Sequence, residues 1–576
     1  LSLLTKFTDM IPEKSSPQEK HVEDACKRKA DGGRAVVAAD FGFSYLEESP
    51  PTGGGSRRTI SESSSDTAAS TESWEDQPSN KRSRLTCGEY GPLEMGSHAK
   101  ASVNPIRQIL ENIAINPNPA KAMIKLHIGD PTITGALPSH PALTEAIMKS
   151  LVSGKYNGYG PAVGFPEVRQ ALAGHIGTPG APVTSEDIIL TSGCSHALQI
   201  AIEGLASPGQ NILVPKPGFP LYTTLTVPHN IEPRFYDLDP ERNWEVDFRS
   251  LESLIDENTV AVVINNPSNP TGAVYSYQHL SDIKRVAAAH GLPIIADEIY
   301  GDMVHDSVKF HPLAEVEPKI PVLSCDGLSK RWLVPGWRLG WLVVYDPCDA
   351  LTEVRKGLMQ LAQKLVGPCA LIQGALPHIL KDVPPCFFRQ SRRILQANAE
   401  VALEELSRVK GIRVVPPKGA MYLMMNLDME MFPEFADDLE LIQAMISEES
   451  VFCLPGTAFQ YPGALRIVLT YPGPQMREAC RRMRDFFQRH FVETETGSSG
   501  KSQPLSLKIP NPPTNRKERL LQNPTYLAMG PQDFVDDTPP QKRANHPPVA
   551  LATDGYTGHS IGLTSGLFEG PHGYDP

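Results

Sequence analysis

Apolar residues in the middle of the chain form short runs that alternate with amphipathic stretches. Four of these runs have the length of strands, at residues 187–191, 211–215, 259–264 and 293–296. Residues 197–205 and 280–287 instead carry apolar side chains three or four positions apart, which predicts helices. Strands that alternate with helices at this spacing favour a parallel sheet with helices on both faces. We therefore expect an α/β fold with a mostly parallel central sheet.

The same kind of pattern continues towards residue 491. Residues 464–470 alternate between small or apolar and polar side chains like a strand. Five apolar residues then recur at helical spacing, namely Met476, Ala479, Met483, Phe486 and Phe487. This spacing predicts an amphipathic helix that closes the folded body.

The two ends of the chain have a different composition. Nine serines lie between Ser56 and Ser83, and twelve prolines lie between Pro504 and Pro576. Neither end shows apolar periodicity, so neither can bury enough surface to offset its chain entropy. We expect residues 1–98 and 494–576 to be disordered, and residues 99–493 to form the folded body.

Charge and cysteine content narrow the class of protein. Lys and Arg number 54 against 66 Asp and Glu, a net charge of −12, which argues against nucleic-acid binding. No apolar run is long enough for a membrane span. The nine cysteines are scattered without a C-x-x-C pair, so we expect reduced thiols, no metal site and a cytosolic location.

Five polar or glycine-containing loops lie in the alternating region. They are residues 192–195 (SGCS), 269–272 (NPTG), 297–300 (DEIY), 329–332 (SKRW) and 336–340 (GWRLG). Binding sites of parallel α/β sheets form at the carboxyl ends of strands, so these loops are candidate site segments.

Three of the loops suggest chemistry, although each also has a plainer interpretation. The SGCS loop opens a helix and its amides suit a phosphate, but an ordinary strand–helix turn has the same pattern. Asp297 follows a buried strand and needs a partner there, for which a helix cap or an arginine would serve. Lys330 lies between Leu328 and Trp332 and could be a desolvated nucleophile, although a lysine beside Arg331 is more often a solvated pair.

Together and in this order, the motifs are far more specific. SGCS, PGFxLY, NPxNPTG, ADEIY and SKRWxxPGWRxGW resemble the fold-type-I aminotransferases that use pyridoxal 5'-phosphate. With GKYNGY at residues 154–159, the likeness extends to the members that act on L-tyrosine. The resemblance covers about residues 104–491. It implies a large lobe of about residues 155–365 and a smaller α/β lobe of about residues 99–154 and 366–493.

The resemblance implies a role for each matching residue around the cofactor ring. Lys330 would bind the cofactor covalently and, once freed, carry the α-proton of the substrate. Asp297 would pair with the ring nitrogen and keep it protonated. Asn269 and Tyr300 would hydrogen-bond the ring oxygen, and Phe219 would stack on the ring face.

A second group of matching residues would hold the cofactor phosphate. The resemblance assigns this role to Arg338, with Ser192, Gly193 and Cys194 at the start of a helix. Tyr159 matches a tyrosine that reaches the phosphate from the neighbouring subunit, which implies a homodimer with shared sites.

Two further matches concern the substrate, and one position departs from the wider superfamily. Arg466 matches the arginine that binds the α-carboxylate beside Asn269, although spacing alone favours an outward-facing residue on an edge strand. Gly129 lies in a segment that would close over the substrate. Gly327 stands where many members have a phosphate-binding hydroxyl, so the phosphate would depend more on Arg338 and the Gly193 loop.

The implied reaction is a ping-pong transamination of L-tyrosine with 2-oxoglutarate. Its products would be 4-hydroxyphenylpyruvate and L-glutamate, the first step of tyrosine breakdown. Two alternatives stay open: another pyridoxal-phosphate enzyme of the superfamily, such as an aromatic or alanine aminotransferase, or a non-catalytic binding or regulatory module. The presence of Lys330, Asp297 and Arg466 argues against the second alternative.

Overall fold

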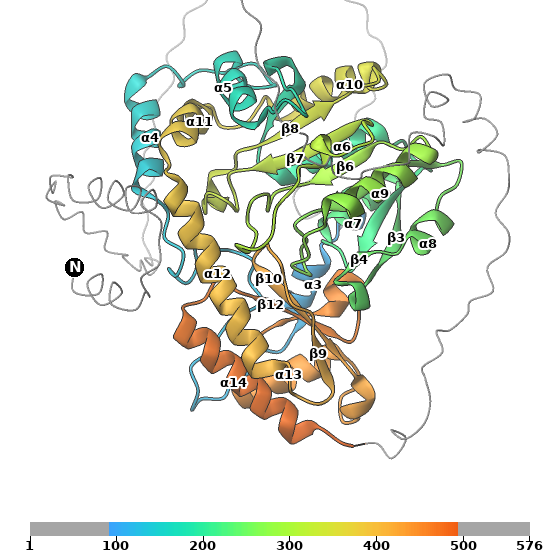
Figure 1. Ribbon diagram of the computed structural model, residues 1–576, viewed down its shortest axis with the longest axis vertical. Helices are drawn as coiled ribbons and strands as arrows, with labels where there is room; N and C mark the ends of the chain where they lie inside the picture. The colour runs from blue at the N-terminus through green and yellow to red at the C-terminus, as the bar shows by residue number, and fades with distance from the viewer. Residues whose placement is uncertain (1–91, 494–576) are drawn as a thin grey trace, which may run out of the picture. The chain divides into compact units, whose positions relative to one another are not determined.

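The computed structural model describes residues 92–493 (Figure 1). The expectations for residues 1–91 and 494–576 lie outside this part of the chain. Residues 92–98 are exposed, and the helix α2 (Ser97–Ala101) begins within them. The lobe boundaries stay a prediction.

Eight strands form a mixed sheet in the order β1-β8-β7-β6-β5-β2-β3-β4. Their bounds are β1 (Ile188–Thr191), β2 (Asn211–Lys216), β3 (Glu232–Asp239), β4 (Glu245–Val246), β5 (Thr259–Asn265), β6 (Ile294–Asp297), β7 (Val322–Gly327) and β8 (Gly340–Tyr345). The four predicted strands correspond to β1, β2, β5 and β6, and the α/β class with a mostly parallel sheet is confirmed.

The strand β8 departs from the parallel arrangement. It runs antiparallel to both β7 and β1, between which it lies. The chain returns from Gly327 to Gly340 through a loop without a crossover α-helix. The end of β7 therefore lies beside the start of β8, and the two strands are antiparallel. This return carries Lys330 across the carboxyl end of the sheet.

Helices cover both faces of the eight-stranded sheet, as the alternating pattern predicts (Figure 1). Ala261 and Val263 of β5 belong to the core cluster that contains the buried face of α6 (Cys194–Leu205). Val262 and Ile264 point the other way and share a cluster with α9 (Tyr277–Ala289). Successive residues of one strand thus pack against different helix layers.

A second, antiparallel sheet has the order β11-β12-β10-β9. It contains β9 (Ile412–Val414), β10 (Tyr422–Leu427), β11 (Leu454–Pro455) and β12 (Ala464–Val468). The predicted strand at residues 464–470 corresponds to β12. The predicted closing helix is α14 (Gly473–His490), in which all five expected apolar residues are buried.

The remaining α-helices flank the two sheets. They are α3 (Pro105–Asn112), α4 (Pro141–Ser153), α5 (Pro166–Ile176), α7 (Leu221–Thr226), α8 (Phe248–Ser253), α10 (Thr352–Ala362), α11 (Ala370–Asp382), α12 (Pro385–Leu406) and α13 (Asp438–Glu449). In residues 92–493, no helix is long and apolar enough to cross a bilayer.

The cysteine expectation needs one correction. Six cysteines of the described part are free thiols, four of them buried. Cys386 is disulfide-bonded. The expectation of reduced thiols throughout is therefore wrong at Cys386. The positions of the cysteines along the sequence do not distinguish this residue from the others.

Candidate active site

A cavity of about 580 Å³ lies where side chains from the two sheets meet. The eight-stranded sheet and its loops contribute Asp297, Tyr300 and Lys330 to its wall. The four-stranded sheet contributes Tyr422 and Arg466. Most of the site residues expected from the sequence therefore line one cavity, although they are spread over more than 330 positions of the chain.

Asp297 is the last residue of β6 and is 2% exposed. Its Oδ2 accepts a hydrogen bond from the Tyr222 hydroxyl at 2.7 Å, and its Oδ1 accepts from the Cys194 thiol at 3.7 Å. Burial raises the pKa of this carboxyl to about 6, and these donors and the Lys330 charge only partly oppose the rise. The carboxylate is thus placed to favour a cationic partner in the cavity.

Lys330 lies three residues beyond the end of β7. Its Nζ donates a hydrogen bond to the carbonyl of Gly129 at 2.7 Å. A Cβ at position 129 would lie 2.8 Å from the Tyr422 hydroxyl, so the segment can approach only with glycine there. The amine is half-buried and points into the cavity, as a covalent attachment point requires.

Arg338 lies in the loop before β8, and its guanidinium reaches the start of α6, the helix that begins at Cys194. Its Nη2 donates to the Ser192 carbonyl at 3.2 Å and to the Ser195 hydroxyl at 3.0 Å. A Cβ on Gly193 would lie 2.4 Å from the same nitrogen, which explains a glycine at φ +80°. The Arg338 guanidinium and the backbone amides at the start of α6 form a positively charged site suited to a phosphate.

The absence of a hydroxyl at Gly327 has a packing reason. A Cβ there would lie 2.8 Å from the Leu339 carbonyl oxygen and 2.8 Å from the Cα of Gly340. The backbones of β7 and β8 are therefore too close for any side chain at this position. Two other hydroxyls lie beside the Arg338 guanidinium, those of Ser195 and Ser329.

Arg466 is buried in the middle of the smaller sheet, because β12 lies between β11 and β10. The outward-facing edge position that spacing alone favoured is therefore wrong. Its Nη1 donates to Asn269 Oδ1 at 2.9 Å and its Nη2 to the His127 carbonyl at 2.9 Å. The buried Nε has no partner in residues 92–493. Burial lowers the pKa of Arg466, so an anion in the cavity would stabilise its charge.

Aromatic rings surround the ligand-binding groups. The guanidinium of Arg466 lies 4.4 Å from the ring centre of Tyr422 and 4.9 Å from that of Phe459. The hydroxyls of Tyr300 and Tyr422 are 2.8 Å apart. Phe219 is half-buried and lines the cavity, edge-on to Tyr222.

Tyr159 is an expected site residue that lies away from the cavity. Its side chain is 94% exposed, and it does not line the cavity of its own chain. Ser192 and Gly193 also do not line the cavity wall; they contribute through the backbone beside Arg338.

Several residues near the site were not assigned from the sequence. Tyr222, which holds Asp297, lies within the PGFxLY motif, so the signal was present but its role was not considered. Tyr422 and His127 follow no motif. Arg107 lines the cavity from α3, which Asn104 caps by accepting the Arg107 amide at 3.2 Å.

Comparison with known proteins defines the class. The sequence profile of the class I and II aminotransferases matches residues 121–483, and the chain belongs to this family. The tyrosine aminotransferase of Bos taurus is 50% identical over 411 residues, 71% of this chain and 91% of that protein. The tyrosine aminotransferase of Homo sapiens is 48% identical over 415 residues, 72% of this chain and 91% of that protein.

Solved structures have the same fold. The tyrosine aminotransferase of Leishmania infantum matches with a TM-score of 0.68 and 32% identity, covering 70% of this chain and 100% of that one. An alanine aminotransferase of Pyrococcus furiosus matches with a TM-score of 0.63 and 27% identity, covering 69% and 100% of the two chains.

Proposed function

We propose that the protein transfers the amino group of L-tyrosine to 2-oxoglutarate with pyridoxal 5'-phosphate as cofactor. The products are 4-hydroxyphenylpyruvate and L-glutamate, as in the first step of tyrosine breakdown. The observation that carries this proposal is the convergence of Lys330, Asp297 and Arg466 on one cavity from two sheets. An amine, a buried carboxylate and a buried guanidinium are the three groups that such a transfer needs.

The residues present fit the cofactor. Lys330 would hold its aldehyde end, Asp297 would pair with its ring nitrogen, and Arg338 with the start of α6 would hold its phosphate. The fit rests on the close approach of the Arg338 guanidinium to Gly193, which a Cβ would prevent, and on the raised pKa of Asp297, which a cationic ring nitrogen would lower again. When bound, pyridoxal 5'-phosphate supplies an electron-poor ring that accepts the electron pair left on the substrate α-carbon.

The protein supplies positioning and proton transfer. Arg466 binds the α-carboxylate of the amino acid, with Asn269 fixing the guanidinium on one side. As a base, the Lys330 amine would carry the proton away from the substrate α-carbon, and the Gly129 carbonyl 2.7 Å from its Nζ would keep the amine inside the cavity. The hydroxyls of Tyr300 and Tyr422 hold one another at 2.8 Å and fix the wall beside Asn269.

The cavity wall supports an aromatic substrate. Its lining includes the apolar side chains of Ile106, Leu110, Leu221 and Phe219. Arg107 adds a third guanidinium to the wall, besides those of Arg338 and Arg466, and has no side-chain partner in residues 92–493. It would meet the distal carboxylate of 2-oxoglutarate, which L-tyrosine lacks. The tyrosine aminotransferases that the chain resembles support the same assignment.

The exposed Tyr159 supports the proposal that two chains form a homodimer with shared sites. A large aromatic side chain that is almost fully exposed is a candidate interface residue. We also propose a cytosolic location, which the six free thiols of residues 92–493 support although Cys386 is bonded.

A substrate panel tests the proposed function. The cofactor-loaded protein is assayed with 2-oxoglutarate and each of L-tyrosine, L-phenylalanine and L-alanine. We expect the highest kcat/KM with L-tyrosine. A preference for L-alanine would favour the alanine type, and no turnover with any amino acid would favour the non-catalytic module. Replacing Arg107 with Gln should raise KM for 2-oxoglutarate about tenfold and leave KM for L-tyrosine nearly unchanged.

A further inference from the structure

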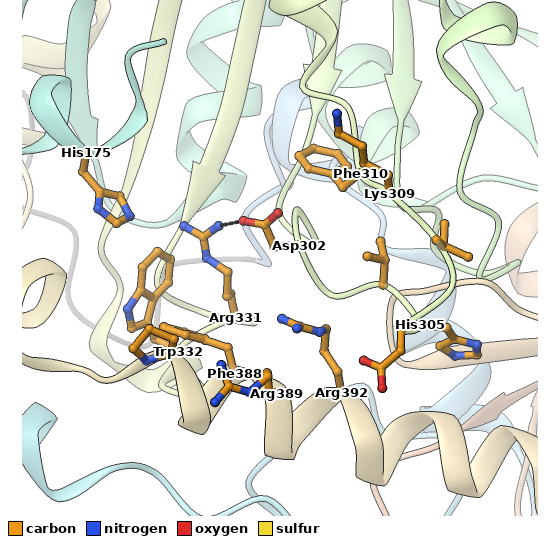
Figure 2. A pocket seen from close by; sticks show the side chains of 14 residues that line it. His175, Asp302, His305, Lys309, Phe310, Arg331, Trp332, Phe388, Arg389 and Arg392 are labelled. Atoms are coloured by element: carbon orange, nitrogen blue, oxygen red, sulfur yellow. Dashed lines mark hydrogen bonds and ion pairs between the residues drawn. The ribbon is translucent and has the colours of Figure 1, made fainter. Parts of the chain in front are cut away.

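A second cavity, of about 530 Å³, lies outside the active site (Figure 2). Its wall comes from the end of α5, the loop after β6, the segment after Lys330 and the first turns of α12. It shares no lining residue with the active-site cavity. The two cavities nevertheless use adjacent residues, since Lys330 faces one and Arg331 the other.

The lining of this cavity is rich in positive charge. Arg331, Lys309, Arg389 and Arg392 contribute four cationic groups. The lining has two carboxylates, Asp302 and Asp306, and both residues are exposed. His175 and His305 add two further nitrogen donors. The whole protein has a net negative charge, so this local excess of cations has the opposite sign.

One of these cations already has partners. The Nη1 of Arg331 lies 2.6 Å from Asp302 Oδ2, and its guanidinium stacks 4.1 Å from the ring centre of Trp332 (Figure 2). These contacts fix the position of the Arg331 group at one wall of the cavity.

The two arginines on α12 have no partner in the part of the chain that the structure describes. Within residues 92–493, the guanidinium groups of Arg389 and Arg392 make no hydrogen bond and no ion pair. Both side chains are half-buried, and their spacing of three places them on one face of α12. Figure 2 shows Arg392 extending from α12 into the cavity, towards the loops that carry Arg331 and Asp302. Like charges gathered in a partly desolvated site are costly unless an anion compensates them.

We propose that this second cavity binds a small anion with two or more negatively charged oxygens, a phosphate ester or a polycarboxylate. Guanidinium groups match both phosphate and carboxylate with paired hydrogen bonds. The start of the 22-residue helix α12 adds its positive dipole end at Pro385. The volume is that of a small-molecule site, larger than a bare ion needs, and Phe310 and Phe388 offer apolar surface for the rest of such a ligand.

Calorimetric titration of the cofactor-loaded protein tests this site. Pyrophosphate and citrate serve as separate probes of the two chemical classes. We expect saturable binding of at least one probe, with one site per chain. Binding of pyrophosphate alone would assign the ligand to phosphate esters, and binding of citrate alone would assign it to polycarboxylates.

Three variants locate the binding. The double change Arg389→Ala and Arg392→Ala should weaken binding at least about a hundredfold, since each lost charged contact costs about tenfold. Arg393→Ala is the matched control, because Arg393 lies on the same helix, is exposed and does not line the cavity. It should leave binding within about twofold. Asp302→Asn should tighten binding, because it removes a competing carboxylate and frees Arg331.

Two results would overturn the proposal. One is the absence of saturable binding of both probes to the unmodified protein. The other is equal affinity in the double variant and in Arg393→Ala, which would place any bound anion elsewhere, for example at Arg338 or Arg466. The Asp302→Asn variant keeps the test decisive if the double variant does not fold, because weaker or unchanged binding in it contradicts the proposed contacts.

Discussion

The two sheets contribute different kinds of groups to the active site. The eight-stranded sheet and its loops supply Asp297 and Lys330. These two groups would take part in the reaction itself, through their charge and their protonation. The four-stranded sheet supplies Arg466, which is clamped between Asn269 and a backbone carbonyl and is suited to binding. If the proposed function is correct, the larger sheet would provide the reactive groups and the smaller sheet would bind the substrate in the same cavity. Substitutions on the larger sheet should therefore lower kcat, and those on the smaller sheet should mainly raise KM.

The largest effect is expected for Lys330→Ala. Loss of the amine removes both covalent attachment and proton transfer, so kcat should fall by at least about 10⁴-fold. Steady-state kinetics with L-tyrosine and 2-oxoglutarate measure the loss. Lys381→Ala, an exposed lysine on α11, is the control and should keep full activity. Substantial turnover in Lys330→Ala would contradict the role of this residue.

Asp297→Asn should lower kcat by about 10³-fold, because a neutral amide does not hold the proton on the ring nitrogen. Asp326→Asn on the adjacent strand β7 is a matched control. Burial also raises the pKa of Asp326, to about 7, but this residue does not line the cavity. A similar loss of kcat in both variants would indicate a structural effect, not a role of Asp297 in the reaction.

Arg466→Leu tests the smaller sheet. Two charge-assisted hydrogen bonds to a carboxylate are worth about 3–4 kcal/mol, so kcat/KM should fall by about 10²–10³-fold, mostly through KM. Arg413→Leu on strand β9 of the same sheet removes an arginine outside the cavity and should change neither constant. If Arg466→Leu lowered kcat with KM unchanged, the division between the two sheets would be wrong.

The smallest effect concerns the pH dependence of stability. Asp297 has a folded-state pKa of about 6, above the ordinary 3.8, so its contribution to stability is present at low pH and is lost as pH rises through 6. In the cofactor-free protein, the free energy of unfolding should therefore lose about 2 kcal/mol more between pH 4.5 and 7.5 than in Asp297→Asn. Urea unfolding of both proteins measures this difference. Identical pH profiles would show that Asp297 is not desolvated.

Local sequence patterns predicted the larger sheet better than the smaller one. Strands β1, β2, β5 and β6 are apolar runs between helices. Their length and apolar composition identify them without any tertiary information. The antiparallel direction of β8 could not be predicted in this way, since the loop that returns from β7 carries no periodic signal.

The same limit applies to the site residues. Motifs at strand ends gave Asp297, Lys330 and Asn269, because one loop position determines where each side chain points. Spacing alone placed Arg466 on an exposed edge, but its burial depends on β11, a two-residue strand too short for any pattern. The partners Tyr222 and Tyr422 depend on contacts across 75 and 122 positions, which single-sequence patterns do not encode.

The most direct test of the central claim is the near-visible absorption spectrum of the cofactor-loaded protein, recorded before and after addition of L-tyrosine without a keto acid. We expect a band from the Lys330-bound cofactor that is replaced by the band of the aminated cofactor when L-tyrosine is added. This change would demonstrate the cofactor, the covalent lysine and the amino donor in one experiment. If the band forms but L-tyrosine leaves it unchanged, the substrate is wrong; if no band forms with added cofactor, the assignment of Lys330 and the enzymatic function itself are contradicted.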